Sequence, residues 1–144
     1  MNSNDLTDPS GYRLWTTERV RFADTDMFGH VNHAVFATYF EVGRSSLGLS
    51  STARVLIPPG AGSVVRVLTV NYLGEVKYPS ETRIGTRIGR VGNSSFTVEQ
   101  VLLVGDKAVA TAEVVYILAN LATGRSTPIP PDLRAHLESC ERPV

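Results

Sequence analysis

The segment from Phe22 to Arg44 holds the greatest density of reactive side chains in this 144-residue chain. It reads F-A-D-T-D-M-F-G-H-V-N-H-A-V-F-A-T-Y-F-E-V-G-R, with two carboxylates and two imidazoles close together. A carboxylate can attack a carbonyl carbon as a nucleophile, or it can act as a base that activates water. The rest of the chain alternates as β-strands do. We therefore expect a sheet that holds this segment and presents it to a ligand.

The same residue types allow a metal site, because carboxylates and imidazoles are common ligands. Such a site would combine Asp24, Asp26, His30 and His33. The two histidines would share a face only on a continuous helix, whereas Gly29 and Asn32 indicate that a helix is just beginning. We therefore predict no metal. We expect His30 to orient the turn by a hydrogen bond or to form a pocket wall, and Asp24 to be a turn residue.

A helix is predicted after this turn, since Asn32 can cap it with its side-chain oxygen. One face carries apolar and small residues at helical spacing, namely Phe36, Tyr39, Phe40, Gly43 and Leu47. A glycine inside a helix costs ~1 kcal/mol relative to alanine, so we expect Gly43 to allow a close approach to a sheet. Glu41 and Arg44 lie three residues apart on the opposite side and are expected to pair.

Period-two alternation predicts the other elements as strands. We place them at residues 14–22, 63–73, 81–91, 95–104 and 107–118, with a short helix at 132–140. Three small residues on one face of the last strand, Ala108, Ala110 and Ala112, leave room for the aromatic helix. The predicted class is α+β, with one long central helix wrapped by an antiparallel sheet of about five strands. The last four strands are expected to form a meander.

Length and composition exclude several classes of protein. A chain of 144 residues is one ordinary domain, with residues 1–13 predicted as a flexible arm. Its formal net charge of zero argues against a nucleic-acid partner. Cys140 is the only cysteine, so no internal disulfide can form. No apolar stretch approaches the ~20 residues of a membrane span, and no secretory signal is visible, so we expect a cytoplasmic protein.

The run D-T-D-M-F-G-H-V-N-H, followed by Y-F-E and Arg44, resembles the hotdog-fold acyl-CoA thioesterases of the 4-hydroxybenzoyl-CoA thioesterase type. The resemblance is specific over residues 22–44 and extends over most of the chain by element order. A weaker match is the run I-G-R-V-G-N-S-S-F that begins at Ile88. The resemblance implies a hotdog fold and the hydrolysis of an acyl thioester. It implies no cofactor, since coenzyme A is part of the substrate.

The resemblance further implies that Asp26 is the catalytic carboxylate, as nucleophile or general base. By family position, the backbone N–H of His33 would polarise the thioester oxygen. Both roles agree with the physical chemistry, because the start of a helix favours negative charge and offers free N–H groups. Gly29 would allow the turn that aims both groups at one atom.

Substrate contacts are expected from two further sets of residues. The phosphates of coenzyme A would meet basic residues, with Lys77 as the weakest candidate and a stronger group at Arg87, Arg90, Ser94 and Ser95. The acyl group would be lined by the aromatic helix face through Phe36 and Tyr39, and Phe28 could close this pocket. Further contacts with the substrate are expected from the turn, through Gly29, His30 and Asn32. The carrier is coenzyme A or an acyl carrier protein, and the protein is expected to be a homodimer or a tetramer.

Three alternatives remain open in the sequence. A second branch of hotdog thioesterases places its catalytic carboxylate on the central helix instead of in the preceding turn. Glu41 is the only acid on the helix of this chain, so it would replace Asp26 in that case. The chain could instead be a non-catalytic acyl-CoA-binding protein, although such a protein has no need of Asp26. A hotdog hydratase or dehydratase would use His30 together with an acid.

Overall fold

The computed structural model describes residues 5–141 and residue 143. Its strands are β1 (Leu14–Arg19), β2 (Ala61–Tyr72), β3 (Glu81–Val91), β4 (Ser95–Val104) and β5 (Lys107–Asn120). Its α-helices are α1 (Val35–Arg44) and α2 (Pro131–Ser139). Short 3-10 helices lie at Pro9–Gly11, Phe22–Asp24, Ser45–Leu47 and Arg54–Leu56. The predicted α+β class is confirmed, and so are the existence and type of every predicted strand and helix.

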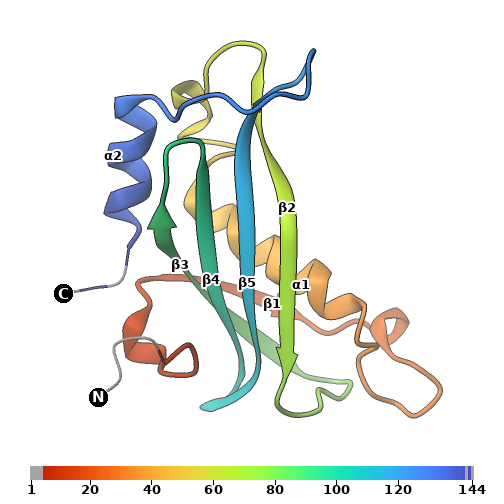
Figure 1. Cartoon of the computed structure of the whole chain (residues 1–144). Helices are drawn as coiled ribbons and strands as arrows, with labels where there is room; N and C mark the ends of the chain where they lie inside the picture. Colours follow the sequence, from red (N-terminus) through yellow and green to blue (C-terminus); the bar gives the residue numbers. More distant parts are fainter. Residues whose placement is uncertain (1–4, 142, 144) are drawn as a thin grey trace.

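The five strands form one antiparallel sheet in the order β1-β3-β4-β5-β2 (Figure 1). The predicted meander is therefore wrong for β2, which pairs with β5 rather than with β3. Tight turns join β3 to β4 and β4 to β5, whereas residues 73–80 carry the chain from the edge strand β2 across the sheet to β3, which lies between β1 and β4. This connection is longer than the two to five residues typical of a hairpin. It leaves β1 and β2 as the two edge strands.

A bulge in β2 explains a break in its sequence pattern. The register with β5 shifts between Val65 and Val67, so Arg66 has no partner in the ladder. Beyond the bulge the strand exchanges its faces. Val64 consequently points away from the side occupied by Leu68, whereas strict alternation would place both residues on one face.

Helix α1 is shorter than the long central helix that the pattern predicted. It has 10 residues, from Val35 to Arg44, and a 3-10 turn of three residues continues it. It starts late because the Oδ1 atom of Asn32 accepts the N–H of Ala34 at 2.9 Å, in a turn that precedes the helix. Asn32 therefore shapes the entry to α1 rather than capping it. Gly48 ends the 3-10 turn with a φ of 74°, in the left-handed region that favours glycine.

The aromatic face of α1 packs on one side of the sheet, and the helix runs diagonally behind the strands in Figure 1. Phe36, Tyr39 and Phe40 form one buried cluster with Ala110 and Ala112 of β5. Ala110 and Ala112 thus receive the aromatic helix, as predicted. Burying large aromatic side chains contributes roughly 1.5–3 kcal/mol each, so this contact holds the helix firmly on the sheet.

The prediction is wrong for Ala108. A register shift between Leu102 and Leu103 places it on the other face of the sheet, against the cluster of Tyr12, Val101 and Leu103.

Helix α2 closes the same side of the sheet at its other end, beside β3 (Figure 1). Leu133 and Leu137, one helical turn apart, are both buried. They join a cluster that contains Leu47, Ile88 and Phe96. The helix was predicted within one residue of its observed bounds.

The beginning of the chain covers part of the opposite face of the sheet. Residues 1–4 of the predicted flexible arm lie outside the described residues. Tyr12 is buried against Val101 and Leu103, and its hydroxyl donates a hydrogen bond to the carbonyl of Leu6 at 2.8 Å. The packed chain therefore begins before residue 14, earlier than predicted.

Candidate functional site

Asp26 begins a tight turn that projects from the start of α1. Its N–H donates to the carbonyl of His30 at 2.8 Å, and its carbonyl accepts the N–H of Gly29 at 3.1 Å. Gly29 has a φ of 78°, which a residue with a side chain rarely adopts. Gly29 therefore permits the tight turn, and its role in aiming two groups at one atom stays a prediction.

The carboxylate of Asp26 is half-buried and held in one orientation by its own turn. Its Oδ1 atom accepts the N–H groups of Phe28 at 2.9 Å and of His30 at 3.3 Å. No residue in the described ranges donates a hydrogen bond to Oδ2. The arrangement leaves one oxygen of a fixed carboxylate available to a ligand.

The turn is anchored at its two ends to the rest of the fold. The N–H of Asn32 donates to the carbonyl of Asp24 at 2.9 Å, and that of Val31 donates to the carbonyl of Val76 at 2.7 Å. His30 also forms a β-bridge with Lys77. These backbone bonds fix the base of the turn whatever side chains it carries.

Asp24 has a structural role that the sequence did not reveal. The hydroxyl of the buried Tyr39 donates to its Oδ2 atom at 2.6 Å, and the N–H of Arg21 donates to the same atom at 2.9 Å. Burial raises the pKa of Asp24, but these hydrogen bonds and the Arg21 charge together outweigh it, so the pKa lies below its usual value. Burial and the neighbouring carboxylate raise the pKa of Tyr39. The pair ties α1 to the turn.

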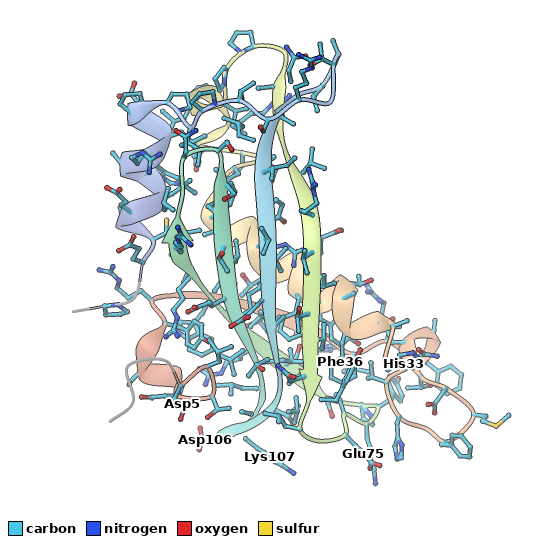
Figure 2. All side chains as sticks on the ribbon, viewed as in Figure 1. Asp5, His33, Phe36, Glu75, Asp106 and Lys107 are labelled. Atoms are coloured by element: carbon cyan, nitrogen blue, oxygen red, sulfur yellow. The ribbon has the colours of Figure 1, made fainter. Side chains whose placement is uncertain are left out.

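The start of α1 offers one unused backbone donor next to this turn. The N–H of Ala34 is bound by Asn32 Oδ1 and that of Val35 by the Asn32 carbonyl. The His33 N–H donates to no acceptor within the described part of the chain. The carbonyl of His33 accepts the hydroxyl of Tyr72 at 2.8 Å, which fixes this peptide against the end of β2. Figure 2 shows His33 beside Phe36 at this end of the strand.

Large apolar side chains at and around the turn are mostly exposed. Met27 is 90% exposed, Phe22 is 76% exposed and Phe28 is 75% exposed. Tyr78 packs edge-to-face on Phe22 at a centroid distance of 5.7 Å. Exposed apolar groups gathered in one place are typical of a binding surface.

Two of the residues predicted to line the acyl pocket are core residues instead. Phe36 and Tyr39 are buried in the main cluster, and the Tyr39 hydroxyl is used by Asp24. The prediction for both as pocket walls is wrong for the single chain, because the aromatic stripe of α1 faces the sheet. Gly29, His30, Asn32 and His33 do lie together around Asp26, and their contact with a substrate stays a prediction.

The structure separates Arg87 from the predicted phosphate site. Its side chain is 2% exposed, and its Nε atom donates to Glu99 Oε2 at 2.6 Å. A second bond runs from Nη1 to the carbonyl of Gly11, and the guanidinium lies over the Tyr12 ring. Arg87 therefore holds the N-terminal segment on the face of the sheet opposite α1. The prediction of Arg87 as a phosphate ligand is wrong, because its side chain is buried.

The other residues of that predicted set lie far from Asp26 within one chain. Arg90 is exposed near the end of β3, Ser94 follows in the turn to β4, and Ser95 is the first residue of β4. The main-chain carbonyl of Gly92 in this turn accepts a hydrogen bond from Arg134 of α2. The strand β3 separates them from the Asp26 end of the sheet, and its 11 residues span roughly 35 Å. Lys77 is the basic residue that the bridge to His30 places at the turn. Sequence reasoning ranked it last because no local signal links residues 30 and 77.

The side-chain positions also bear on the possible metal site and on the predicted ion pair between Glu41 and Arg44. Within residues 5–141 and 143, no three His, Cys, Asp or Glu side chains are arranged to hold a metal ion. His30 Nε2 instead lies 3.2 Å from Glu75 Oε2. Glu41 is exposed and forms no ion pair with Arg44 in the described structure, so that predicted pair is wrong.

Comparison with known proteins adds two findings about sequence. A family model described as the thioesterase-like superfamily matches residues 20–137. An uncharacterised protein of Bacillus subtilis, YsmA, is 36% identical over 93 residues. That alignment covers 62% of this chain and 60% of the relative, so the chain spans less than two thirds of that protein's length.

Solved structures of similar shape include two from bacteria. One is described as a predicted thioesterase from Bacillus stearothermophilus, with a TM-score of 0.79, 28% identity and coverage of 89% of this chain and 96% of that chain. The other is a DHNA-CoA thioesterase from Staphylococcus aureus, with a TM-score of 0.77, 25% identity and coverage of 87% and 88%. The predicted hotdog fold is thereby confirmed. Neither α1 nor α2, nor any other helix in the described ranges, has the length and apolarity to span a membrane.

Proposed function

The chain belongs to the thioesterase-like superfamily, and on this premise we propose that it hydrolyses an acyl thioester of coenzyme A or of an acyl carrier protein. The products would be a free acid and a thiol. The observation that carries the proposal is the fixed carboxylate of Asp26, with one unbound oxygen, on the turn that leads to the unused N–H of His33. Asp26 would attack the thioester carbon or activate water for that attack, and the His33 N–H would polarise the thioester oxygen.

Asp26 can act in either of two ways. As a nucleophile, its Oδ2 attacks the thioester carbon, the C–S bond breaks, and water then hydrolyses the resulting anhydride. As a general base, it takes a proton from water, the hydroxide attacks the same carbon, and the proton passes to the departing sulfur. In both routes negative charge develops on the carbonyl oxygen, where the His33 N–H would stabilise it.

The surroundings support a substrate that is partly apolar and partly anionic. The exposed rings and thioether around the turn suit an acyl group or the pantetheine arm of coenzyme A. Lys77, exposed and bridged to His30, is the cation best placed for a phosphate. Arg90 is also exposed but lies at the other end of the sheet.

The edge strand β2 supports the homodimer or tetramer that the family resemblance implies. Val64, Val65, Val67 and Leu68 are each between 39% and 47% exposed, on both faces of a strand with one free edge. A long apolar edge strand left uncovered is prone to pairing with another chain. A second copy of this protein is the occupant that we propose for it.

The test is thiol release from short, long and aromatic acyl-CoA substrates by the full chain and by Asp26→Asn. An asparagine Oδ1 can accept the same two N–H bonds, so the turn should persist while kcat falls by roughly 10²-fold or more. Asp106→Asn is the matched control, because it removes one exposed carboxylate from the β4–β5 turn. Full activity of Asp26→Asn would refute the catalytic assignment. An inactive wild type on every substrate would favour the acyl-CoA-binding alternative.

A further inference from the structure

His30 lies directly across the neck of the turn from Asp26. The N–H of Asp26 donates to the His30 carbonyl at 2.8 Å, and the N–H of His30 donates to Asp26 Oδ1 at 3.3 Å. The next pair along the neck, Thr25 and Val31, forms an antiparallel bridge. Directly opposed residues in such a ladder have Cβ atoms about 4.5–5.5 Å apart. A group that reacts at Asp26 is therefore within reach of the His30 side chain.

Glu75 determines which nitrogen of the His30 ring exchanges a proton. Its Oε2 atom lies 3.2 Å from His30 Nε2, so this nitrogen keeps its hydrogen and donates it to the carboxylate. Nδ1 is then the nitrogen that gains and loses a proton. No residue in the described ranges forms a hydrogen bond with Nδ1, and the side chain is 31% exposed. The ring can therefore present Nδ1 to a ligand.

The connection at residues 73–80 holds Glu75 beside the turn. The N–H of Val31 donates to the carbonyl of Val76 at 2.7 Å, and both valines are buried in the main core cluster. Lys77, on the other side of Val76, forms the β-bridge to His30. Figure 2 shows Glu75 and His33 at the same end of the sheet. The core thus fixes the backbone on both sides of the pair, although the Glu75 side chain is 63% exposed.

Charges of both signs lie around the His30 ring. Asp26 on the turn and Glu75 on the connection are negative, whereas Lys77 and Lys107, which reaches the same connection from β5, are positive. Among the described residues, only Glu75 has an oxygen within ion-pair distance of the ring. A carboxylate at this distance favours the protonated imidazole. The pair can therefore hold a proton that is available to a substrate.

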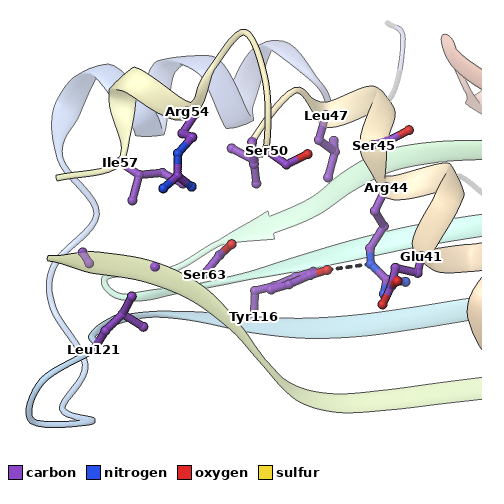
Figure 3. A pocket seen from close by; sticks show the side chains of 13 residues that line it. Glu41, Arg44, Ser45, Leu47, Ser50, Arg54, Ile57, Ser63, Tyr116 and Leu121 are labelled. Atoms are coloured by element: carbon purple, nitrogen blue, oxygen red, sulfur yellow. Dashed lines mark hydrogen bonds between the residues drawn. The ribbon is translucent and has the colours of Figure 1, made fainter. Parts of the chain in front are cut away.

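The other two histidines have different surroundings. The His33 ring lies edge-on to Tyr72 at a centroid distance of 6.3 Å and has no carboxylate partner in the described structure. His136 Nε2 lies 2.7 Å from the carbonyl oxygen of Leu47, a residue that lines the cavity at the other end of α1 (Figure 3). Only His30 combines a carboxylate partner with a place opposite the proposed catalytic aspartate.

We propose that His30, paired with Glu75, gives the proton that the departing sulfur takes up, an inference that rests on the thioester hydrolysis proposed above. If Asp26 is the nucleophile, the C–S bond breaks with its electron pair on sulfur, and the sulfur takes the Nδ1 proton and leaves as a thiol. Water then opens the anhydride, and the proton released restores the imidazolium. If Asp26 is the base, the proton that it takes from water passes to His30 after the thiol has left. Both routes end with free acid, thiol and imidazolium.

The first test compares two leaving groups on one acyl group. The substrates are the coenzyme A thioester that the wild type hydrolyses fastest and the 4-nitrothiophenyl ester of the same acid. An alkanethiolate needs a proton to leave, whereas a nitrothiophenolate is stable without one. His30→Gln should lower kcat/KM, which covers the steps up to thiol release, by about 10²-fold or more on the coenzyme A ester and by less than about threefold on the aryl ester. Equal losses on the two esters would refute proton transfer from His30.

The second test follows kcat/KM on the coenzyme A ester with pH. Activity should fall as the imidazolium loses its proton, and His30→Gln should lack this alkaline limb. Glu75→Gln keeps an acceptor for Nε2 but removes the charge that favours the imidazolium, so the limb should move to lower pH. Lys77→Gln should move it to higher pH, and Glu138→Gln, exposed on α2, should leave it in place. An unchanged limb in Glu75→Gln would refute the role of the pair.

Asp26→Asn separates this inference from the proposed function. Loss of activity in Asp26→Asn on both esters, together with equal losses on the two esters in His30→Gln, would keep the hydrolysis and overturn only the role of His30. Full activity of Asp26→Asn would overturn the catalytic assignment itself. A leaving-group dependence that appears in His33→Gln instead of His30→Gln would place the proton on the other imidazole and refute the inference. Circular dichroism of each variant would show whether it is folded.

Discussion

The polar groups at the two ends of α1 are held in place in different ways. At its start, Asp26 is fixed by backbone N–H groups of its own turn, and the side chains around it are exposed. At its end, Arg44 is fixed by side chains from β4 and β5 that lie 56 and 72 residues away in sequence. We expect the first end to be less sensitive to changes in the core than the second, which is held by buried side chains. We therefore predict that single substitutions will affect the groups at one end of α1 without affecting those at the other end.

The largest expected effect on stability comes from Gly43→Ala. An added Cβ would overlap Ile84 Cγ2 and would lie 2.9 Å from Gln100 Nε2, so α1 could no longer rest on the sheet. Overpacking of this kind costs about 1–3 kcal/mol, which outweighs the gain in helix propensity. Urea denaturation would measure the loss.

If the two ends are independent, kcat of Gly43→Ala on an acyl-CoA should change little at a temperature where the variant is folded. A large loss of kcat in the folded variant would show that the two ends are coupled.

Tyr39→Phe should be next in size. It removes the hydroxyl that bonds Asp24 and leaves a buried carboxylate with one partner fewer. Loss of a hydrogen bond to a charged group costs about 1.5–3 kcal/mol, and the remaining Arg21 bond should keep the cost near the lower value. The free energy of unfolding is again the measurement, with Tyr78→Phe as the exposed control. A loss no larger than that of the control would contradict the link between α1 and the turn.

The dependence of stability on pH should identify the same pair. The folded pKa of Asp24 lies below the ordinary value of 3.8, so its ionised form stabilises the fold above that pH, and this stabilisation is lost as pH falls through the folded pKa. We expect the difference in unfolding free energy between wild type and Asp24→Asn to be constant near neutrality and to shrink below pH 3.8. A difference that grows on acidification would contradict the sign.

The smallest effect is expected for Phe28→Ser at the exposed turn. Phe28 is 75% exposed, so the free energy of unfolding should change by less than about 0.5 kcal/mol. If the exposed apolar side chains around the Asp26 turn bind the substrate, KM should rise while kcat is unchanged. A destabilisation comparable to that of Gly43→Ala would show that the turn is packed against something, such as a second copy of the chain.

Much of the fold could be predicted because local sequence patterns determine where its strands and helices lie. Alternation located β3 and β4 at their observed bounds, and the spacing of Phe36, Tyr39 and Phe40 identified the buried face of α1. The position of β2 could not be predicted in this way, since the pairing of edge strands depends on the path of residues 73–80. Arg66 interrupts the apolar alternation of β2, but this break alone does not reveal that a bulge exchanges the two faces of the strand.

The sequence by itself determined the turn at Asp26, because its glycine, carboxylate and backbone bonds all lie within a few residues. Only the tertiary structure decided which residues surround the other groups. It buried Arg87 under Tyr12, used Tyr39 to hold Asp24, and brought Gln100 and Tyr116 to Arg44. Gln100 was the one available signal, a polar residue in the inward row of a strand. Contacts between distant segments follow from strand order and register, which no local pattern encodes.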